Sequence, residues 1–368
     1  MAELTELKQY ARLHARGQGL DPRRTARLLA GVHDDEPGSP TSWARVWSRA
    51  GDELLDRRHY LDAARHYTLA RFPYPADEFR ARAQQRAVAA VDAWRKERGG
   101  IERKEFGLPG GTVRAWASGL DRAASRPLLV VMGGIVSTKE QWAPLLPKLT
   151  RLGFATVVTE LPGVGENEQP YGPDAWGFLP ELLDRLDGWA DTADTSLLAL
   201  SFSGHLALRA SLEDRRIRRI LTVGAPVARF FTDERWWSTQ VPGITKDVLG
   251  HLTGAAGHDA LLASLSGGGW ALTPDRLASV TASLGYVLSS RDEIIPRDDS
   301  RLLAAALDRL ALKEFDDVHG SPAHLGEMRT WLLATLLRFR SEADPRARAL
   351  DLVLAVQEFA SRRRGAGV

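Results

Sequence analysis

The sequence predicts an α/β protein: a mostly parallel sheet flanked by helices, with a helical segment ahead of it and a helical insertion within it. Short apolar runs alternate with helical patterns between residues 126 and 317, which is typical of a parallel sheet covered on both faces. Residues 1–98 show helical periodicity alone. Residues 227–282 separate two of the apolar runs by far more than one crossover needs.

Composition narrows the class of protein. A chain of 368 residues with 44% apolar content can bury a large core and favours two units, or one domain with insertions. Cysteine is absent, which excludes disulfides, thiolate metal ligands and a cysteine nucleophile. The net charge of +2 is small and mixed, so nucleic-acid binding is not expected. The N-terminus lacks an apolar signal core and no apolar run approaches membrane-spanning length, so we expect a cytoplasmic protein that does not engage a membrane.

Residues 1–98 are predicted to form a helical N-terminal domain. Helical spacing runs over 20–29, residues 35–42 supply a break and a cap, and residues 43–71 place aromatic and small residues at helical intervals. Prolines at 73 and 75 end this pattern, and a further helix is expected over 77–97. We interpret the aromatic residues here as core packing. The histidines, including His14, lack metal-ligand spacing and are interpreted as structural.

Residues 99–226 are predicted to be the first part of the α/β core. The segment 101–119 alternates polar and apolar residues around Pro-Gly-Gly, which indicates a β-hairpin. The expected elements that follow are, in order, a strand at 126–134, a helix at 137–153, a strand from 154 that leaves through a Gly-rich loop, a helix at 174–190, a strand at 196–200 and a strand at 218–226.

The remaining chain divides into an insertion and a second part of the core. Residues 227–282 are helical and aromatic, with three glycines at 267–269 that could serve as a hinge. Because an insertion at this point leaves the carboxyl end of the strands, we expect a lid over a site there. Residues 283–368 complete the core with strands at 283–296 and 311–317 and a C-terminal helix.

The stretch Thr195–Leu212 predicts a serine nucleophile. An apolar strand turns into a helix around small residues, the setting of a nucleophile elbow. With Ser201 as nucleophile, the crowded flanking positions hold Ala199 and Ser203; with Ser203, one of them would hold the bulky His205. The Ser201 register is therefore preferred, although the usual G-x-S-x-G has become A-x-S-x-S.

Acyl transfer by serine also needs a base and an orienting carboxylate, expected in the chain order serine, acid, histidine after successive strands. Asp292 follows the apolar strand at 283–289, and His319 follows the strand and turn at 311–318. His319 would take the proton of Ser201, and Asp292 would fix its tautomer. Glu293 and His324 are the competing acid and base.

The tetrahedral intermediate requires hydrogen-bond donors for its oxyanion. The backbone N–H of Phe202, directly after the serine, is one candidate. The second is expected in the loop after the strand at 126–132, where Gly134 lets the backbone approach a ligand, and the Ile135 N–H is preferred. Phosphate binding by this loop is rejected, because the G-x-x-x-x-G-K-[ST] spacing is missing.

These residues resemble an α/β-hydrolase of the FrsA-like group, which includes pseudooxynicotine-type C–C hydrolases and polyketide-shortening hydrolases. The stretches that carry the resemblance are LLVVMGGIVSTKEQW, TELPGVGENEQP, LALSFSGHLAL, LTVGAPV, SSRDEIIP and DDVHGSP. The resemblance implies the α/β-hydrolase fold and a triad of Ser201, Asp292 and His319. It also makes Glu140, near the site entrance in relatives, a candidate substrate contact. Ala199, Ser203 and Met132 depart from the usual pattern.

The expected function is cleavage of an acyl bond (an ester, a thioester or a C–C bond beside a ketone) through an acyl-enzyme, without a cofactor or metal. The aromatic insertion, with Trp236 and Trp237 as candidate substrate-binding residues, suggests a bulky, partly aromatic or polyketide-like small molecule. Two alternatives stay open: non-hydrolytic cyclisation, dehydration or acyl transfer at the same site, and a retired site in a regulatory binding protein. A homodimer is a further expectation.

Overall fold

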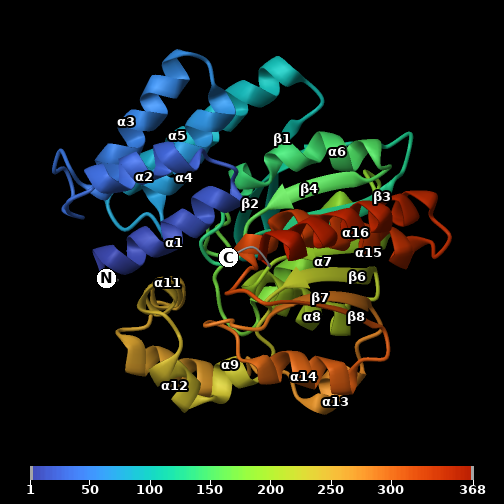
Figure 1. Cartoon of the computed structure of the whole chain (residues 1–368). Coiled ribbons are helices and arrows are strands. Elements are labelled where there is room, and N and C mark those ends of the chain that lie inside the picture. The colour runs from blue at the N-terminus through green and yellow to red at the C-terminus, as the bar shows by residue number, and fades with distance from the viewer. Residues whose placement is uncertain (1–2, 366–368) are drawn as a thin grey trace.

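An eight-stranded sheet forms the centre of the computed structural model, which describes residues 3–365 (Figure 1). Its strand order is β1-β2-β4-β3-β5-β6-β7-β8. The strands from β3 to β8 are parallel, and the antiparallel hairpin β1–β2 completes one edge. The strands are β1 (Glu102–Leu108), β2 (Gly111–Ser118), β3 (Pro127–Met132), β4 (Ala155–Thr159), β5 (Asp191–Ala199), β6 (Ile217–Val223), β7 (Ser283–Ser289) and β8 (Leu310–Phe315). The predicted fold class is confirmed.

The parallel strands β3 to β7 are largely apolar because both faces of the sheet are buried there. Side chains alternate between the faces along a strand, so Val130 of β3 joins one apolar cluster while its neighbour Val131 joins the other. On the first face lie α7 (Phe178–Leu186), α8 (Phe202–Glu213) and α14 (Arg297–Ala306). On the second lie α6 (Leu146–Arg151), α15 (Leu325–Arg340) and α16 (Pro345–Gly365).

The helix predicted over 137–153 is shorter than expected. The chain there forms two 3₁₀ turns, η1 (Lys139–Gln141) and η2 (Ala143–Leu145), before α6 begins at Leu146. Pro144 is the second residue of η2, and Pro147 is the second residue of α6. Because proline cannot donate the hydrogen bond that a helix interior requires, each one restarts the helix.

Five helices precede the sheet: α1 (Leu4–Gly17), α2 (Pro22–Gly31), α3 (Trp43–Asp56), α4 (Tyr60–Arg71) and α5 (Glu78–Arg98). Trp43 and Trp47 are fully buried and belong to the apolar cluster on one face of the sheet, while Tyr67 belongs to the cluster on the other. These aromatic residues therefore pack in the core, and the helical region shares its core with the sheet.

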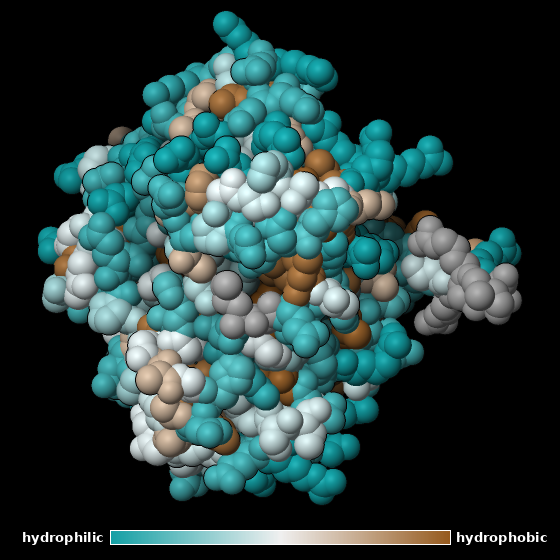
Figure 2. All heavy atoms as spheres, turned by 90° about the vertical axis from the view of Figure 1, so that its left-hand side faces the viewer, coloured by the Kyte–Doolittle hydropathy of each residue, from teal (hydrophilic) through white to brown (hydrophobic). Residues whose placement is uncertain are grey.

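The insertion between β6 and β7 consists of α9 (Arg229–Thr232), α10 (Glu234–Thr239), α11 (Gly243–Thr253), α12 (His258–Gly267) and α13 (Pro274–Ala278). It meets the N-terminal region, since α1 lies beside α11 (Figure 1). The His251 ring of α11 also stacks on the ring of Tyr74, between α4 and α5, with the ring centres 4.4 Å apart. Figure 2 shows this side of the molecule as mostly hydrophilic, with hydrophobic side chains reaching the surface in a narrow zone near its middle.

Among residues 3–365, no helix combines the length and the apolar character that crossing a membrane requires.

Candidate active site

The turn between β5 and α8 holds Ser201 in a strained conformation. Its φ of 55° and ψ of −126° are unusual for a residue that carries a Cβ, and such strain clusters at functional sites. The backbone is held in place because the Ser201 N–H donates to the Val223 carbonyl at 2.9 Å. A Cβ at Gly204 would lie 2.1 Å from the Thr222 hydroxyl, so Gly204 is the position where the turn has no room for a side chain. The A-x-S-x-S sequence therefore still forms a sharp elbow.

Ser201, His319 and Asp292 form a continuous row of hydrogen bonds. Ser201 Oγ lies 3.1 Å from His319 Nε2, and His319 Nδ1 lies 2.9 and 3.0 Å from the two Asp292 oxygens. Asp292 Oδ1 also accepts the N–H groups of Ile294 and Ile295, which fix the carboxylate. Because a carboxylate accepts from Nδ1–H, Nε2 of the neutral ring is free to accept a proton from the serine.

Electrostatics favour a basic His319. Burial alone would lower the pKa of the imidazole. The charge and hydrogen bond of Asp292, together with the charge of Glu293, outweigh burial and raise this pKa above its ordinary value.

Ser203 is occupied elsewhere. It is fully buried and its hydroxyl donates to the Gly133 carbonyl at 2.5 Å. Ser201 is thus the serine that meets the imidazole in this structure, and Ser203 braces the elbow against the end of β3.

The competing acid and base lie off the row. Glu293 accepts the backbone N–H of His319 at 3.0 Å through Oε2, and its Oε1 accepts the Tyr10 hydroxyl at 3.0 Å. His324 Nδ1 lies 2.5 Å from Glu327, and its ring stacks on Phe315. Glu293 therefore holds the histidine loop and links it to α1, whereas His324 is engaged outside the row.

Two backbone N–H groups beside Ser201 remain free. A Cβ on Gly134 would come within 3.1 Å of the Ser201 Cβ, which places the loop after β3 directly against the serine. This loop is a turn closed by a hydrogen bond from Ser137 N to the Gly134 carbonyl. Among the described residues, none accepts a hydrogen bond from the N–H of Ile135 or Phe202. Both expected donors are thus available at the elbow.

Glu140 has a structural role instead of the expected substrate contact. Its side chain is buried, pairs with Lys139 at 3.0 Å and accepts the indole N–H of Trp116 at 3.1 Å. Lys139 is fully buried and also contacts Glu160 and Glu166. Burial raises the pKa of Glu160 to about 7, while Lys139 outweighs burial at Glu140 and lowers its pKa. Glu140 belongs to an internal ion cluster.

Of the two tryptophans of the insertion, Trp237 differs from expectation, whereas substrate binding by Trp236 stays a prediction. Trp237 is buried, packs against Phe230 and donates its indole N–H to the Phe230 carbonyl. It is a core residue of the insertion. Trp236 is half-buried and donates to the carbonyl of Ile294 at 2.8 Å, so it braces the loop that carries Asp292.

The N-terminal helix α1 contributes residues that the sequence analysis missed. Tyr10 reaches the histidine loop through Glu293, and burial followed by that carboxylate's charge raises the pKa of its hydroxyl. His14 lies close enough to His319 to feel its charge, and burial first, then that charge, lowers the His14 pKa to about 4. Their helical spacing is that of ordinary core residues, so the sequence carried no signal for either role.

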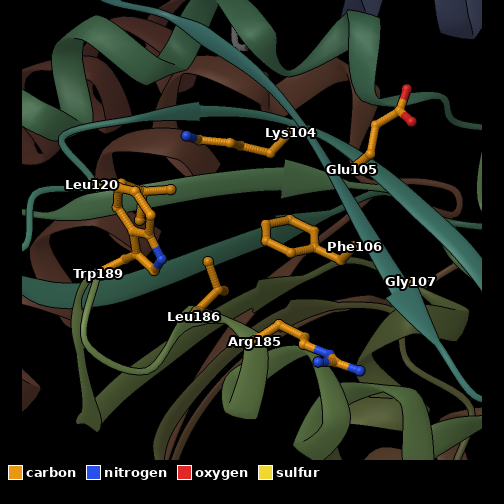
Figure 3. A pocket seen from close by; sticks show the side chains of 8 residues that line it. All are labelled: Lys104, Glu105, Phe106, Gly107, Leu120, Arg185, Leu186 and Trp189. Carbon is orange, nitrogen blue, oxygen red and sulfur yellow. The ribbon is translucent and has the colours of Figure 1, made fainter.

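A separate cavity of about 410 Å³ lies away from the row. Lys104, Phe106, Leu186 and Trp189 line it together with their neighbours, as Figure 3 shows. Trp189 precedes β5, whereas Ser201 follows that strand. The cavity is therefore at the opposite end of β5 from the hydrogen-bonded row.

Comparison with known proteins identifies the family. The FrsA-like esterase family model matches residues 42–316, which is most of the chain. The protein belongs to the FrsA-like family. The esterase FrsA of Klebsiella pneumoniae subsp. pneumoniae is 25% identical over 226 residues, and that of Escherichia fergusonii is 25% identical over 229 residues. These matches cover 59% of this chain, and the chain spans about half the length of these curated relatives (54% and 55%).

Solved structures share the overall fold of this chain. The structure of AbyA5 is 48% identical, with a TM-score of 0.90 over 96% of this chain and 99% of that one. The 2,6-dihydroxy-pseudo-oxynicotine hydrolase is 19% identical, with a TM-score of 0.67 over 87% of this chain and 94% of that one. The second likeness is one of fold, and it extends to the α/β-hydrolase architecture with its additional helical regions.

Proposed function

We propose that this protein is a hydrolase that cleaves an acyl bond through a covalent intermediate on Ser201. The observation that carries the proposal is the unbroken row Ser201–His319–Asp292 beside two free backbone N–H groups. This arrangement supplies a nucleophile, a base and an oxyanion site in the geometry that acyl transfer needs. Membership of the FrsA-like esterase family supports the same reaction class.

In this mechanism Ser201 Oγ attacks the acyl carbon while His319 Nε2 takes the hydroxyl proton. The N–H groups of Phe202 and Ile135 receive the oxyanion of the tetrahedral intermediate. Collapse of the intermediate breaks the bond to the leaving group, which takes the proton from His319. Water then attacks the acyl-enzyme by the same route and releases a carboxylic acid. Asp292 stabilises the imidazolium formed in each half-reaction.

The proposed substrate is a bulky acyl compound, partly aromatic or polyketide-like, with an ester, a thioester or a ketone C–C bond. Support comes from two regions that bind the loop carrying Asp292: α1, through Tyr10 on Glu293, and the insertion, through Trp236 on the Ile294 carbonyl. Such cover offers contacts beyond the scissile bond. If the bond is C–C, the carbon that leaves takes the proton from His319.

We propose that the insertion acts as a wall of the site, anchored at its beginning and after α12. Asp299 is fully buried and accepts the backbone N–H groups of residues 227–230, where the insertion begins. After α12, Arg209 donates to the carbonyls of Gly269 and Trp270. The last of the glycines at 267–269, which were expected to act as a hinge, is therefore held in place.

Labelling with a fluorophosphonate tests the nucleophile, with intact mass as the readout. We expect one adduct on the wild type, none on Ser201→Ala, strong loss on His319→Ala, and full labelling of Ser203→Ala. An unlabelled wild type that gives a normal circular dichroism spectrum and a cooperative melt would contradict the proposal and favour non-hydrolytic chemistry or a binding role. Labelling that persists in Ser201→Ala and is lost in Ser203→Ala would identify Ser203 as the nucleophile instead.

A further inference from the structure

Arg71, at the end of α4, is a buried cation outside the hydrogen-bonded row. Its side chain is 2% exposed. Nε donates to Gln84 at 3.1 Å, and Nη1 donates to the carbonyls of Pro73 at 2.9 Å and Val136 at 2.8 Å. These three bonds fix the guanidinium against the loop after β3.

The second terminal nitrogen of Arg71 is unoccupied. Nη2 donates no hydrogen bond to any residue in the described part of the chain, nor does any carboxylate there form an ion pair with Arg71. Nη2 is also absent from the set of fully enclosed unpaired polar atoms, so it faces accessible space. Burial lowers the pKa of Arg71 to about 10, which leaves the group charged at pH 7.

Among the described residues, two other buried cations have close carboxylates, whereas Arg209 donates to carbonyls and has only the exposed Asp174 at 3.9 Å. Arg80, equally buried, holds Asp35 and Asp77, and Lys139 holds three glutamates. A buried charge without a direct partner costs several kcal/mol. Glu140 and Glu160 compensate Arg71 only from a distance. Arg71 thus keeps one donor, Nη2, that no described residue uses.

Arg71 lies next to the proposed catalytic row. The Val136 carbonyl that it binds belongs to the turn that presents the Ile135 N–H and begins at Gly134, against Ser201. Successive Cα atoms are 3.8 Å apart, so Val136 and Gly134 are separated by at most about 8 Å. A substrate of moderate length can span from Ser201 to Arg71.

His14 offers a second donor in the same place. Its ring lies within range of the charges of both Arg71 and His319 and packs against Phe72, with ring centres 4.9 Å apart. None of the hydrogen bonds among residues 3–365 involves its ring nitrogens, and neither nitrogen is fully enclosed. A neutral imidazole still carries one N–H that can donate to an anion.

We propose that Arg71, assisted by His14, binds a carboxylate of the substrate, so that the enzyme acts on anionic acyl compounds. This inference rests on the proposed attack by Ser201, because it places the acyl carbon at Ser201 and the carboxylate at Nη2. A guanidinium donates a strong charge-assisted bond to such a group. The N-terminal helices thereby select the substrate.

The first test compares two ester probes of equal length, mono-p-nitrophenyl adipate and its methyl ester. We expect the wild type to prefer the anionic probe in kcat/KM. The ratio between the two probes should fall by about 10- to 100-fold in Arg71→Met, the range for losing a hydrogen bond to a charged group. Arg71→Lys should keep part of the preference.

Arg80→Lys is the matched control, since Arg80 is equally buried and, like Arg71, donates to the segment after α4, through the Phe72 carbonyl at 3.2 Å. It should keep the wild-type ratio. Equal losses on both probes in Arg71→Met would assign Arg71 a purely structural role and overturn the inference. A wild type with no preference for the anionic probe would overturn it without any variant.

Calorimetric binding to Ser201→Ala separates the two proposals. Monomethyl adipate should bind this variant more tightly than dimethyl adipate, and the additional change Arg71→Met should remove the difference. If Ser201 proves unreactive while this difference is present, the acyl-enzyme proposal fails and the anion site stands. If Ser201 is labelled and both compounds bind alike, the anion site fails alone.

Discussion

Gly224 provides a sharp test of how tightly the row is packed. It follows β6 with a φ of 59°, and its N–H donates to the Val287 carbonyl. A Cβ added here would lie 2.7 Å from Cε1 and 2.9 Å from Nδ1 of His319, and 3.1 Å from Asp292 Oδ2. Gly224→Ala therefore presses directly on the imidazole and its carboxylate.

The size of the effect follows from these distances. Ordinary contacts begin near 3.4 Å, so the ring has to move by about 0.7 Å. A shift of about 1 Å in a reacting group can cost about 100-fold in rate. We expect kcat/KM for a p-nitrophenyl ester to fall by about 30- to 100-fold. The left-handed backbone adds a stability loss of about 1–2 kcal/mol, measured by urea unfolding.

Gly320→Ala separates strain from collision. Gly320 is adjacent to His319 and has a φ of 79°, but a Cβ there would meet nothing within 4 Å. This variant should lose similar stability and keep activity within about threefold of the wild type. If Gly224→Ala and Gly320→Ala have equal activity, the contact between the added Cβ and His319 does not lower the rate, and the tight packing inferred for the row is wrong.

Three further predictions concern the groups around the row. Lys139→Met should lower the free energy of unfolding at pH 7 by about 3–5 kcal/mol, because it leaves buried carboxylates without their cation. This loss should shrink toward pH 5 as Glu160 protonates. A loss that urea titrations find to be the same at both pH values would contradict this. The rate at which fluorophosphonate labels Ser201 should decline as the pH falls, with a midpoint above pH 6.5, because the raised pKa of His319 keeps its imidazole protonated there. Asp292→Asn removes the cause of the raised pKa and should move this midpoint to lower pH. Ser203→Ala should unfold about 1–3 kcal/mol more easily with Ser201 labelling intact, whereas loss of labelling would make Ser203 part of the reaction.

The sheet and the row were predictable because their signals are local. The parallel strands β3 to β7 contain apolar runs, the β1–β2 hairpin shows alternation around a turn, and Ser201, Asp292 and His319 come two to four residues after the end of a strand. In parallel strands these ends meet at one edge of the sheet. The helix over 137–153 was predicted too long because the pattern of apolar residues outweighed its two prolines.

The roles that were missed depend on distant contacts. Tyr10 binds Glu293 across 283 residues, and Arg71 binds the Val136 carbonyl across 65. Nothing in the spacing around either residue distinguishes a contact with the site from packing. The same reason explains Glu140, whose sequence position suggested the site entrance while its burial with Lys139 is a property of the folded chain.

Trapping the covalent intermediate tests whether Ser201 carries the acyl group during the reaction. The wild type is mixed with mono-p-nitrophenyl adipate, quenched in acid within milliseconds and examined by intact mass and peptide mapping. We expect a burst of p-nitrophenolate and an adipoyl adduct on the peptide that contains Ser201, absent from Ser201→Ala. Steady release of product by the wild type with no adduct at any quench time, even though fluorophosphonate labels Ser201, would contradict an acyl-enzyme.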